Sequence, residues 1–156
     1  LRGPDRLHGN QEKYTLVRCP ACSLVWLRNP PEPSEMHLHY TDAYDRLISA
    51  SGKNSPHRWR ERKAALTPYK ASGALLDLGC SSGSFLEFMR SEPWKLYNIE
   101  MSKDSADIAE AASGAEIFVG DILKAPFGRE SFDVITCFDV LEHLYEPRLV
   151  LAKVGK

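Results

Sequence analysis

The spacing of hydrophobic and polar residues along the chain changes near residue 72. From there, short apolar runs alternate with segments of helical periodicity. An apolar run of about four to eight residues between turn residues is typical of a buried parallel strand. Such runs predict strands at residues 74–78, 95–100, 115–119 and 132–138. The segments that follow them predict helices at residues 82–90, 103–112 and 144–154. Ser102 is placed to cap the second of these helices, and Gly114 is placed to end it.

This alternation of strands and helices predicts an α/β fold, a doubly wound, Rossmann-like parallel sheet with right-handed crossovers. A helical lead-in at residues 34–72 precedes the sheet. In it, Ser34 can cap a short helix. A second helix is expected to start after Ser55-Pro56, with proline at its first position, and to end before Pro68.

The first 33 residues form a separate segment. It ends in a proline-rich stretch at residues 29–33, which is typical of a stiff connector. We therefore expect three parts: a β-knuckle segment at 1–33, the helical lead-in at 34–72 and the N-terminal part of a ligand-binding domain at 73–156.

Composition and charge exclude several classes of protein. Hydrophobic residues make up 43% of the chain and charged residues 26%, the balance of a soluble globular protein. The formal net charge is −1 with acids and bases interleaved, which argues against a nucleic-acid partner. No apolar run approaches the roughly 20 residues that span a bilayer, so no membrane partner is expected. Four cysteines are too few for a disulfide scaffold, and a reducing, cytoplasmic location is expected.

The turn after the first predicted strand is the most informative segment. Gly79 and Gly83 allow the backbone to turn sharply and to approach a ligand closely. A dinucleotide-binding fingerprint would need glycines where Ser81 and Ser84 stand. Asp77, two residues before the first glycine, would repel a diphosphate but suits a ligand that carries an ammonium group.

Two further acidic residues follow the next two predicted strands. Glu100 ends the second strand, where a carboxylate can accept both hydroxyl groups of a ribose. Asp121 follows the third strand and can accept the exocyclic amine of an adenine, with Ile122 against the ring. Ammonium, ribose and adenine together describe S-adenosylmethionine better than a phosphate-bearing cofactor.

Four segments in this order resemble motifs of the class I S-adenosylmethionine-dependent methyltransferases: residues 75–88, 98–102, 120–122 and 132–137. The resemblance implies that Asp77, Gly79 and Gly83 line the methionine end, while Glu100 and Asp121 hold ribose and adenine. Ser81 departs from the family, which usually has glycine there. The expected residues of the S-adenosylmethionine site are Asp77, Gly79, Cys80, Ser81, Gly83, Glu100, Met101, Asp121, Ile122 and Phe138.

The loop after the fourth predicted strand should face the sulfonium, and its candidate catalytic residues are Asp139, Glu142 and His143. His143 suits a general base, because imidazole exchanges a proton near neutral pH. If the segment is helical, the three side chains share a face and could hold a divalent cation. Metal ligands at this place are implied by a resemblance to ubiquinone-pathway O-methyltransferases and small RNA 3′-end methyltransferases. Alternatively, Glu142 and His143 cap and orient the following helix.

Residues 14–26 are expected to form a strand, a knuckle and a returning strand around Cys19 and Cys22. Such a knuckle is half of a zinc ribbon, and its two cysteines are candidate ligands of a structural zinc ion. The segment resembles the zinc-binding element that precedes some sugar and secondary-metabolite methyltransferases, which carry a second cysteine pair upstream. Three alternatives stay open: the sequence begins after that pair, His37 and His39 complete the site, or no metal binds.

We expect an enzyme that transfers the methyl group of S-adenosylmethionine to an oxygen or carbon atom of a small molecule or sugar-type acceptor. The alternatives are a non-catalytic or truncated S-adenosylmethionine-binding module and a nucleotide-dependent oxidoreductase. A class I methyltransferase has seven strands, and the fourth strand predicted here would be an exposed apolar edge. We therefore also expect the native polypeptide to continue beyond Lys156.

Overall fold

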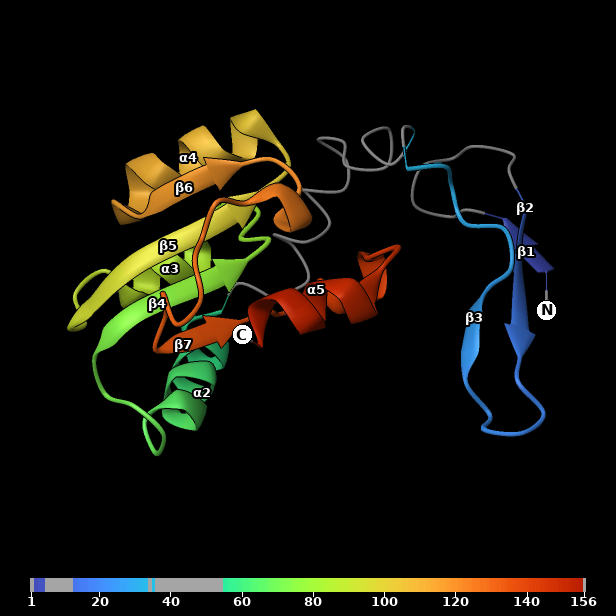
Figure 1. The fold of residues 1–156 in the computed structure, drawn as a ribbon, viewed down its shortest axis with the longest axis horizontal. Helices are drawn as coiled ribbons and strands as arrows, with labels where there is room; N and C mark the ends of the chain where they lie inside the picture. Colours follow the sequence, from blue (N-terminus) through green and yellow to red (C-terminus); the bar gives the residue numbers. More distant parts are fainter. Residues whose placement is uncertain (1, 5–12, 34, 36–54, 156) are drawn as a thin grey trace. The chain divides into compact units, whose positions relative to one another are not determined.

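The computed structural model describes residues 2–4, 13–33, 35 and 55–155. The chain divides into two compact units, Leu1–Lys53 and Asn54–Lys156. Figure 1 traces the chain through both units. Within the described residues, no helix combines the length and the apolar character that crossing a membrane requires.

The first unit contains a three-stranded antiparallel sheet in the order β1-β2-β3. Its strands are β1 (Arg2–Pro4), β2 (Lys13–Arg18) and β3 (Val25–Leu27). The predicted strand, knuckle and returning strand are confirmed as β2, its turn and β3, whereas β1 was not predicted. The side chains of β3 are exposed, so backbone pairing rather than burial holds this hairpin. The short helix expected after Ser34 lies outside the described residues.

The second unit is built on a four-stranded parallel sheet in the order β6-β5-β4-β7. Its strands are β4 (Gly73–Leu78), β5 (Trp94–Glu100), β6 (Glu116–Val119) and β7 (Val134–Thr136). The order confirms the doubly wound fold. The fourth strand, Val134–Thr136, is shorter than its prediction at 132–138 and pairs with Leu75, Leu76 and Asp77 of β4.

The helices of the second unit are α2 (Pro56–Leu66), α3 (Ser84–Met89), α4 (Lys103–Ser113) and α5 (Pro147–Val154). The hydroxyl of Ser55 caps α2, that of Ser102 caps α4, and Gly114 ends α4 with a φ of 69°. The last helix was predicted to start at residue 144. It starts at Pro147 instead, since proline favours the first helical position and Leu144 is extended.

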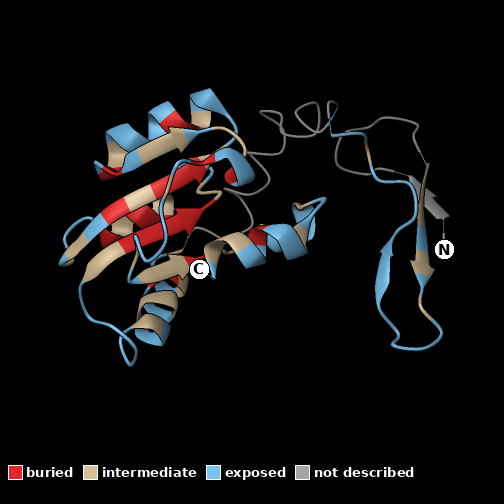
Figure 2. Cartoon of the chain, in the orientation of Figure 1, coloured by how far each residue is buried: buried red, intermediate tan, exposed pale blue. Residues whose placement is uncertain are grey.

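Alternate residues of the strands build two apolar layers, one on each face of the sheet. On one face, Leu75 and Leu96 pack against α3 and against Trp59 of α2. On the other face, Leu76 packs in a cluster with Val150 of α5. Figure 2 shows the buried residues concentrated in the central strands β4 and β5. The sheet is therefore covered on both sides, as parallel sheets require.

Candidate functional site

Three buried polar side chains form a row across the carboxyl ends of β5, β4 and β7. Asp77 of β4 lies in register between Asn98 of β5 and Thr136 of β7. The Thr136 hydroxyl donates to Asp77 Oδ1 at 2.6 Å, and the Asn98 amide donates to the main-chain oxygen of Asp77 at 2.6 Å. Buried polar groups are stable only when hydrogen-bonded, so this polar row holds the Asp77 carboxylate in one orientation.

Opposing interactions act on the pKa of the Asp77 carboxyl group. Burial raises its pKa to about 7, while the Thr136 hydrogen bond and the positive charge of Arg62 act in the opposite direction. The nearby carboxylate of Glu100 raises the pKa further. A cationic group placed against Asp77 would favour its charged form, as expected for a site that holds an ammonium group.

The polar row also contains an acceptor without a partner. Asn98 Oδ1 is buried and has no hydrogen-bond partner among the described residues. Leaving such an oxygen unsatisfied costs about 1–3 kcal/mol. It is therefore available to one more donor at this end of the sheet.

Glu100 is tied directly to the glycine turn. Its Oε2 accepts a hydrogen bond from the Ser81 N–H at 3.1 Å, and its Oε1 accepts one from the Ser102 N–H at 3.0 Å. The Gly79 N–H donates to the carbonyl oxygen of Ile99 at 2.9 Å. The structure thus brings together the turn and the acidic strand end that the sequence pointed to separately, with the carboxylate already oriented.

The two glycines of the turn are required for different reasons. Both have left-handed φ angles, 68° at Gly79 and 74° at Gly83. A Cβ atom at Gly79 would lie 2.7 Å from Val140 Cγ2, whereas one at Gly83 would lie 2.6 Å from the Cβ of Ala109 on α4. Close packing of α3 on α4 therefore explains Gly83, although its sequence position had suggested close approach of a ligand. Ser81, which stands where the family usually has glycine, also adopts a left-handed φ of 51°.

The residues expected around adenine lie at the ends of β5 and β6. Asp121 Oδ1 accepts the Leu123 N–H at 2.9 Å and so caps η2 (Ile122–Lys124). Ile122 is buried in the core and Met101 is exposed. The segment is joined to the Glu100 strand end, since the Gly120 N–H donates to the Glu100 carbonyl oxygen at 2.8 Å.

The loop after β7 is not an α-helix, so Asp139, Glu142 and His143 do not share a helical face. Asp139 has a left-handed φ of 58°, and only a 3₁₀ turn, η3 (Leu141–His143), follows. Glu142 and His143 are exposed at this turn. The part of the chain that the structure describes contains no group of three or more His, Cys, Asp or Glu placed to hold a metal ion.

Asp139 is instead paired with two arginines of α2 that sequence reasoning missed. Arg58 and Arg62 each donate to Asp139 Oδ2, at 2.8 and 3.1 Å. The Arg62 guanidinium also lies over the ring of Phe138, 3.8 Å from its centroid. The signal for the two arginines was their spacing of four residues, which places both on one face of a helix. Thr136, a single hydroxyl in an apolar strand, was missed as well.

The cysteine knuckle of the first unit is a tight turn. The Cys19 N–H donates to the Leu24 carbonyl oxygen at 2.8 Å, and the Ser23 N–H donates to the Cys19 carbonyl oxygen at 3.0 Å. Backbone N–H groups of Cys22 and Ala21 lower the pKa of the Cys19 thiol, which favours the thiolate that binds metals. His37 and His39 lie outside the described residues.

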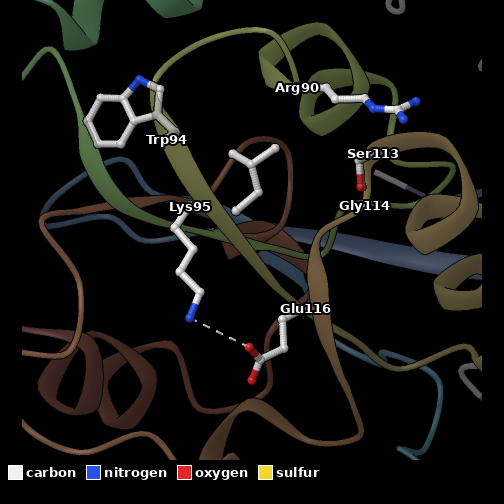
Figure 3. Close-up of a pocket in the computed structure, with 7 residues that line it drawn as sticks. Arg90, Trp94, Lys95, Ser113, Gly114 and Glu116 are labelled. Carbon is white, nitrogen blue, oxygen red and sulfur yellow. Dashed lines mark ion pairs between the residues drawn. The ribbon is translucent and has the colours of Figure 1, made fainter.

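A hollow of the second unit lies at the opposite edge of the sheet (Figure 3). Its volume is about 340 Å³, and Trp94 and Lys95 at the start of β5 line it together with Arg90 and Glu116. In open α/β sheets, ligands bind beyond the carboxyl ends of the strands. This hollow at the amino ends is therefore not the expected ligand site.

Comparison with known proteins finds relatives that are methyltransferases. A dTDP-4-amino-2,3,4,6-tetradeoxy-D-glucose N,N-dimethyltransferase of Saccharopolyspora spinosa is 33% identical over 100 residues, covering 63% of this chain and 40% of that protein. A ubiquinone biosynthesis O-methyltransferase of Stutzerimonas stutzeri is 26% identical over 117 residues, covering 61% of this chain and 50% of that protein. The chain thus spans half or less of the length of these relatives.

Among solved structures, the S-adenosylmethionine-bound amino pentose methyltransferase CalS10 of Micromonospora echinaspora superposes with a TM-score of 0.62. It is 24% identical, and the match covers 74% of this chain and 51% of CalS10. A family model described as a methyltransferase domain matches residues 76–155, just over half of the chain. The chain therefore belongs to the methyltransferase domain family, with the Rossmann-like fold of the class I S-adenosylmethionine-dependent methyltransferases.

Proposed function

We propose that this chain binds S-adenosylmethionine and transfers its methyl group to a small-molecule or sugar-type acceptor. The observation that carries the proposal is the double anchoring of Glu100, whose two oxygens accept backbone N–H groups of the turn and of the next helix cap. Each oxygen keeps a second lone pair, and the pair of oxygens can therefore accept the two hydroxyl groups of a ribose.

The other cofactor contacts follow from the positions of the groups around Glu100. Asp77, held by Thr136, would take the ammonium group of the methionine end. Gly79, Cys80 and Ser81 would supply the turn that passes beside it. At the adenine end, Asp121 would accept the exocyclic amine. The proposed cofactor site also includes three apolar neighbours, Met101, Ile122 and Phe138. Gly83 is included because it lets α3 pack on α4.

The methyl acceptor is proposed to be an oxygen or carbon atom of a small molecule. The names of the relatives add a third possibility, since one acts on the amine of an amino sugar and another is an O-methyltransferase. Transfer is an in-line displacement of the methyl group from sulfur, in which correct placement of the nucleophile matters most. The part of the relatives that this chain does not span would contribute to that placement.

His143 and Glu142 are proposed to act on the acceptor from the turn after β7. Both are exposed, so His143 can take a proton from an acceptor hydroxyl. Asp139, paired with two arginines, is a weaker candidate for acid–base chemistry. We expect His143→Ala to abolish methyl transfer but to leave cofactor affinity within about twofold, measured by product formation and by calorimetry. Equal losses of both would make His143 a structural residue.

Cys19 and Cys22 are proposed to be two ligands of a structural zinc ion. The lowered pKa of the Cys19 thiol and the tight turn support this assignment. A tetrahedral zinc site needs two more ligands, beyond those of the knuckle.

The proposal also keeps the division of the chain into three parts: a knuckle segment at 1–33, a lead-in at 34–72 and a cofactor-binding domain at 73–156.

The test of the cofactor site is a calorimetric titration with S-adenosylhomocysteine. We expect micromolar binding (about −8 kcal/mol) that Glu100→Ala weakens at least about tenfold, because a charge-assisted pair of hydrogen bonds is lost. Glu116→Ala is the matched control, since it removes a strand glutamate at the other edge of the same sheet. NAD should give no heat. Binding of NAD, or equal affinity in the Glu100→Ala and wild-type chains, would contradict the proposal.

A further inference from the structure

The side chain of Lys153 reaches from α5 to the turn that follows β6. Its Nζ donates to the main-chain oxygens of Leu123 and Ala125, at 2.9 and 2.7 Å. These two residues stand 30 and 28 positions earlier in the chain, and Lys153 itself is half-buried in the last turn of α5. The ammonium group therefore links a distant backbone segment to this helix.

The short helix η2 is held by opposite charges at its two ends. At its amino end, the Asp121 carboxylate accepts the Leu123 N–H at 2.9 Å. At its carboxyl end, the ammonium of Lys153 binds two carbonyl oxygens. Both charges complement the dipole of a helical turn, which is positive at the N–H end and negative at the carbonyl end. Asp121 and Lys153 thus hold the same residue, Leu123, through its N–H and through its carbonyl oxygen.

Apolar packing alone leaves room around this turn. Ile122 belongs to the same apolar cluster as Val150 of α5. A hollow of about 80 Å³ remains beside Ile122, and Phe132 and Lys153 are among the residues that line it. Protein interiors are normally close-packed, so an unfilled hollow permits the turn to shift. The two hydrogen bonds of Lys153 supply the directional restraint that the apolar contacts lack.

The restrained turn forms the proposed adenine end of the site. It is joined to the proposed ribose end, because the Gly120 N–H donates to the Glu100 carbonyl oxygen at 2.8 Å. The direction of the Asp121 carboxylate depends on Leu123, whose N–H holds one of its two oxygens. A shift of Leu123 would therefore turn the other oxygen away from an exocyclic amine, since hydrogen bonds weaken steeply with angle and distance.

We infer that Lys153 is a positioning residue for the recognition of adenine, because it fixes η2 and thereby the direction of the Asp121 carboxylate that selects a base with an exocyclic amine. The inference rests on the proposed function, which sets adenine against Asp121. Lys153 acts through Asp121 and needs no contact of its own with the cofactor. The helix α5 thereby takes part in the choice of base.

The test compares S-adenosylhomocysteine with S-inosylhomocysteine, in which an oxygen replaces the exocyclic amine of the base. We expect the wild-type chain to prefer S-adenosylhomocysteine by at least about tenfold, the value of a charge-assisted hydrogen bond. Lys153→Met keeps an apolar stem but loses both donors, and should reduce the preference to about threefold or less. Lys153→Arg should keep most of it, because a guanidinium can still donate to both carbonyl oxygens. Lys124→Met is the matched control, since Lys124 is exposed on the same turn.

Calorimetry gives the ratio of the two affinities within each variant, and this ratio does not depend on how well the variant folds. An unfolded fraction lowers both apparent affinities by the same factor. Equal weakening of both ligands in Lys153→Met, or an undiminished preference, would show that Lys153 only secures α5 and would overturn the inference. A wild-type chain without any preference would overturn it too, because Asp121 would then not select the amine.

Asp121→Ser tests whether Lys153 acts through Asp121. Serine retains an oxygen that can cap the turn but lacks the second carboxylate oxygen. In this background Lys153→Met should cause no further loss of preference, because the two substitutions affect one contact and are not additive. An additive loss in the double variant would contradict the inference. Failure of the wild-type chain to bind S-adenosylhomocysteine would instead contradict the proposed function.

Discussion

The two edges of the same parallel sheet differ in almost every physical respect. At the carboxyl edge, the polar row is buried and its two hydrogen bonds to Asp77 measure 2.6 Å. At the amino edge lies a hollow of about 340 Å³, where Lys95 and Glu116 approach to 4.0 Å with side chains that are 70% and 68% exposed. The edge with this hollow is therefore the one whose charged side chains are exposed and loosely paired.

This difference teaches that fixed polar groups, rather than volume, mark the functional edge. A buried carboxylate is costly unless it is hydrogen-bonded, so its presence requires a network that also fixes its direction. An exposed ion pair is screened by water and imposes no such order. Substitutions at the two edges should therefore have very different consequences.

The largest effect is expected from the charge of Asp77. The folded chain holds the Asp77 proton up to a pH of about 7, whereas the unfolded chain loses it near pH 3.8. Between these values the folded state binds more protons, so the Asp77 contribution to the free energy of unfolding falls as pH rises, by up to about 4 kcal/mol. Urea unfolding at pH 5 and pH 8 should show about 3 kcal/mol of this loss in the wild-type chain and none of it in Asp77→Asn. The same pH dependence in both chains would contradict it.

The same charge should govern cofactor affinity. An ammonium group binds the ionised form of Asp77, so the affinity for S-adenosylhomocysteine should rise from pH 6 to pH 8 as Asp77 loses its proton. Arg62 and Glu100 are the charged groups whose electrostatic interaction with Asp77 shapes this titration. Calorimetry on Asp77→Asn at the same pH values should give weaker binding with a flat profile.

Two glycines, Gly83 near the carboxyl edge and Gly114 near the amino edge, distinguish the stability cost of steric crowding from that of a strained φ angle. Gly83→Ala should destabilise the chain by about 3 kcal/mol, since its Cβ would clash with Ala109 and its φ is left-handed. Gly114→Ala should cost only about 1 kcal/mol, because its φ is 69° but nothing lies within 4 Å of the added Cβ. Chemical unfolding of the two variants measures the difference. Equal losses would mean that α3 and α4 separate easily.

A smaller loss is expected from the hydroxyl of Thr136. Thr136→Val keeps the shape of the side chain but removes the donor to Asp77, and should destabilise the chain by about 2 kcal/mol at pH 8. The loss should be smaller at pH 5, where Asp77 is protonated. Thr136→Ser should restore most of the stability. If Thr136→Val had wild-type stability at pH 8, the hydrogen bond from Thr136 to Asp77 would not stabilise the site.

The smallest effect is expected at the amino edge. Glu116→Ala and Lys95→Ala remove an ion pair that is mostly exposed, and their melting temperatures should match that of the wild-type chain. Their affinities for S-adenosylhomocysteine should also be unchanged. A clear loss of binding in either variant would reverse the comparison of the two edges.

Much of the fold could be predicted from local patterns. The four parallel strands and the caps at Ser55, Ser102 and Gly114 follow from residues close together in the chain, because each depends on neighbouring backbone groups. The strand β1 was missed because Arg2–Pro4 is too short to show a periodicity. The start of the last helix was set three residues too early, because the apolar pattern continued through Leu144 and Tyr145.

The sequence by itself determined the order of strands and helices, the glycine turn and the acidic strand end at Glu100, since spacing along the chain encodes each of them. Only the tertiary structure decided that Gly83 serves the packing of α4 and that Arg58 and Arg62 hold Asp139. Those arginines are 81 and 77 residues from their partner in sequence. Their meeting depends on how α2 packs beside β7, and packing arises from the shape of the whole core rather than from any local pattern.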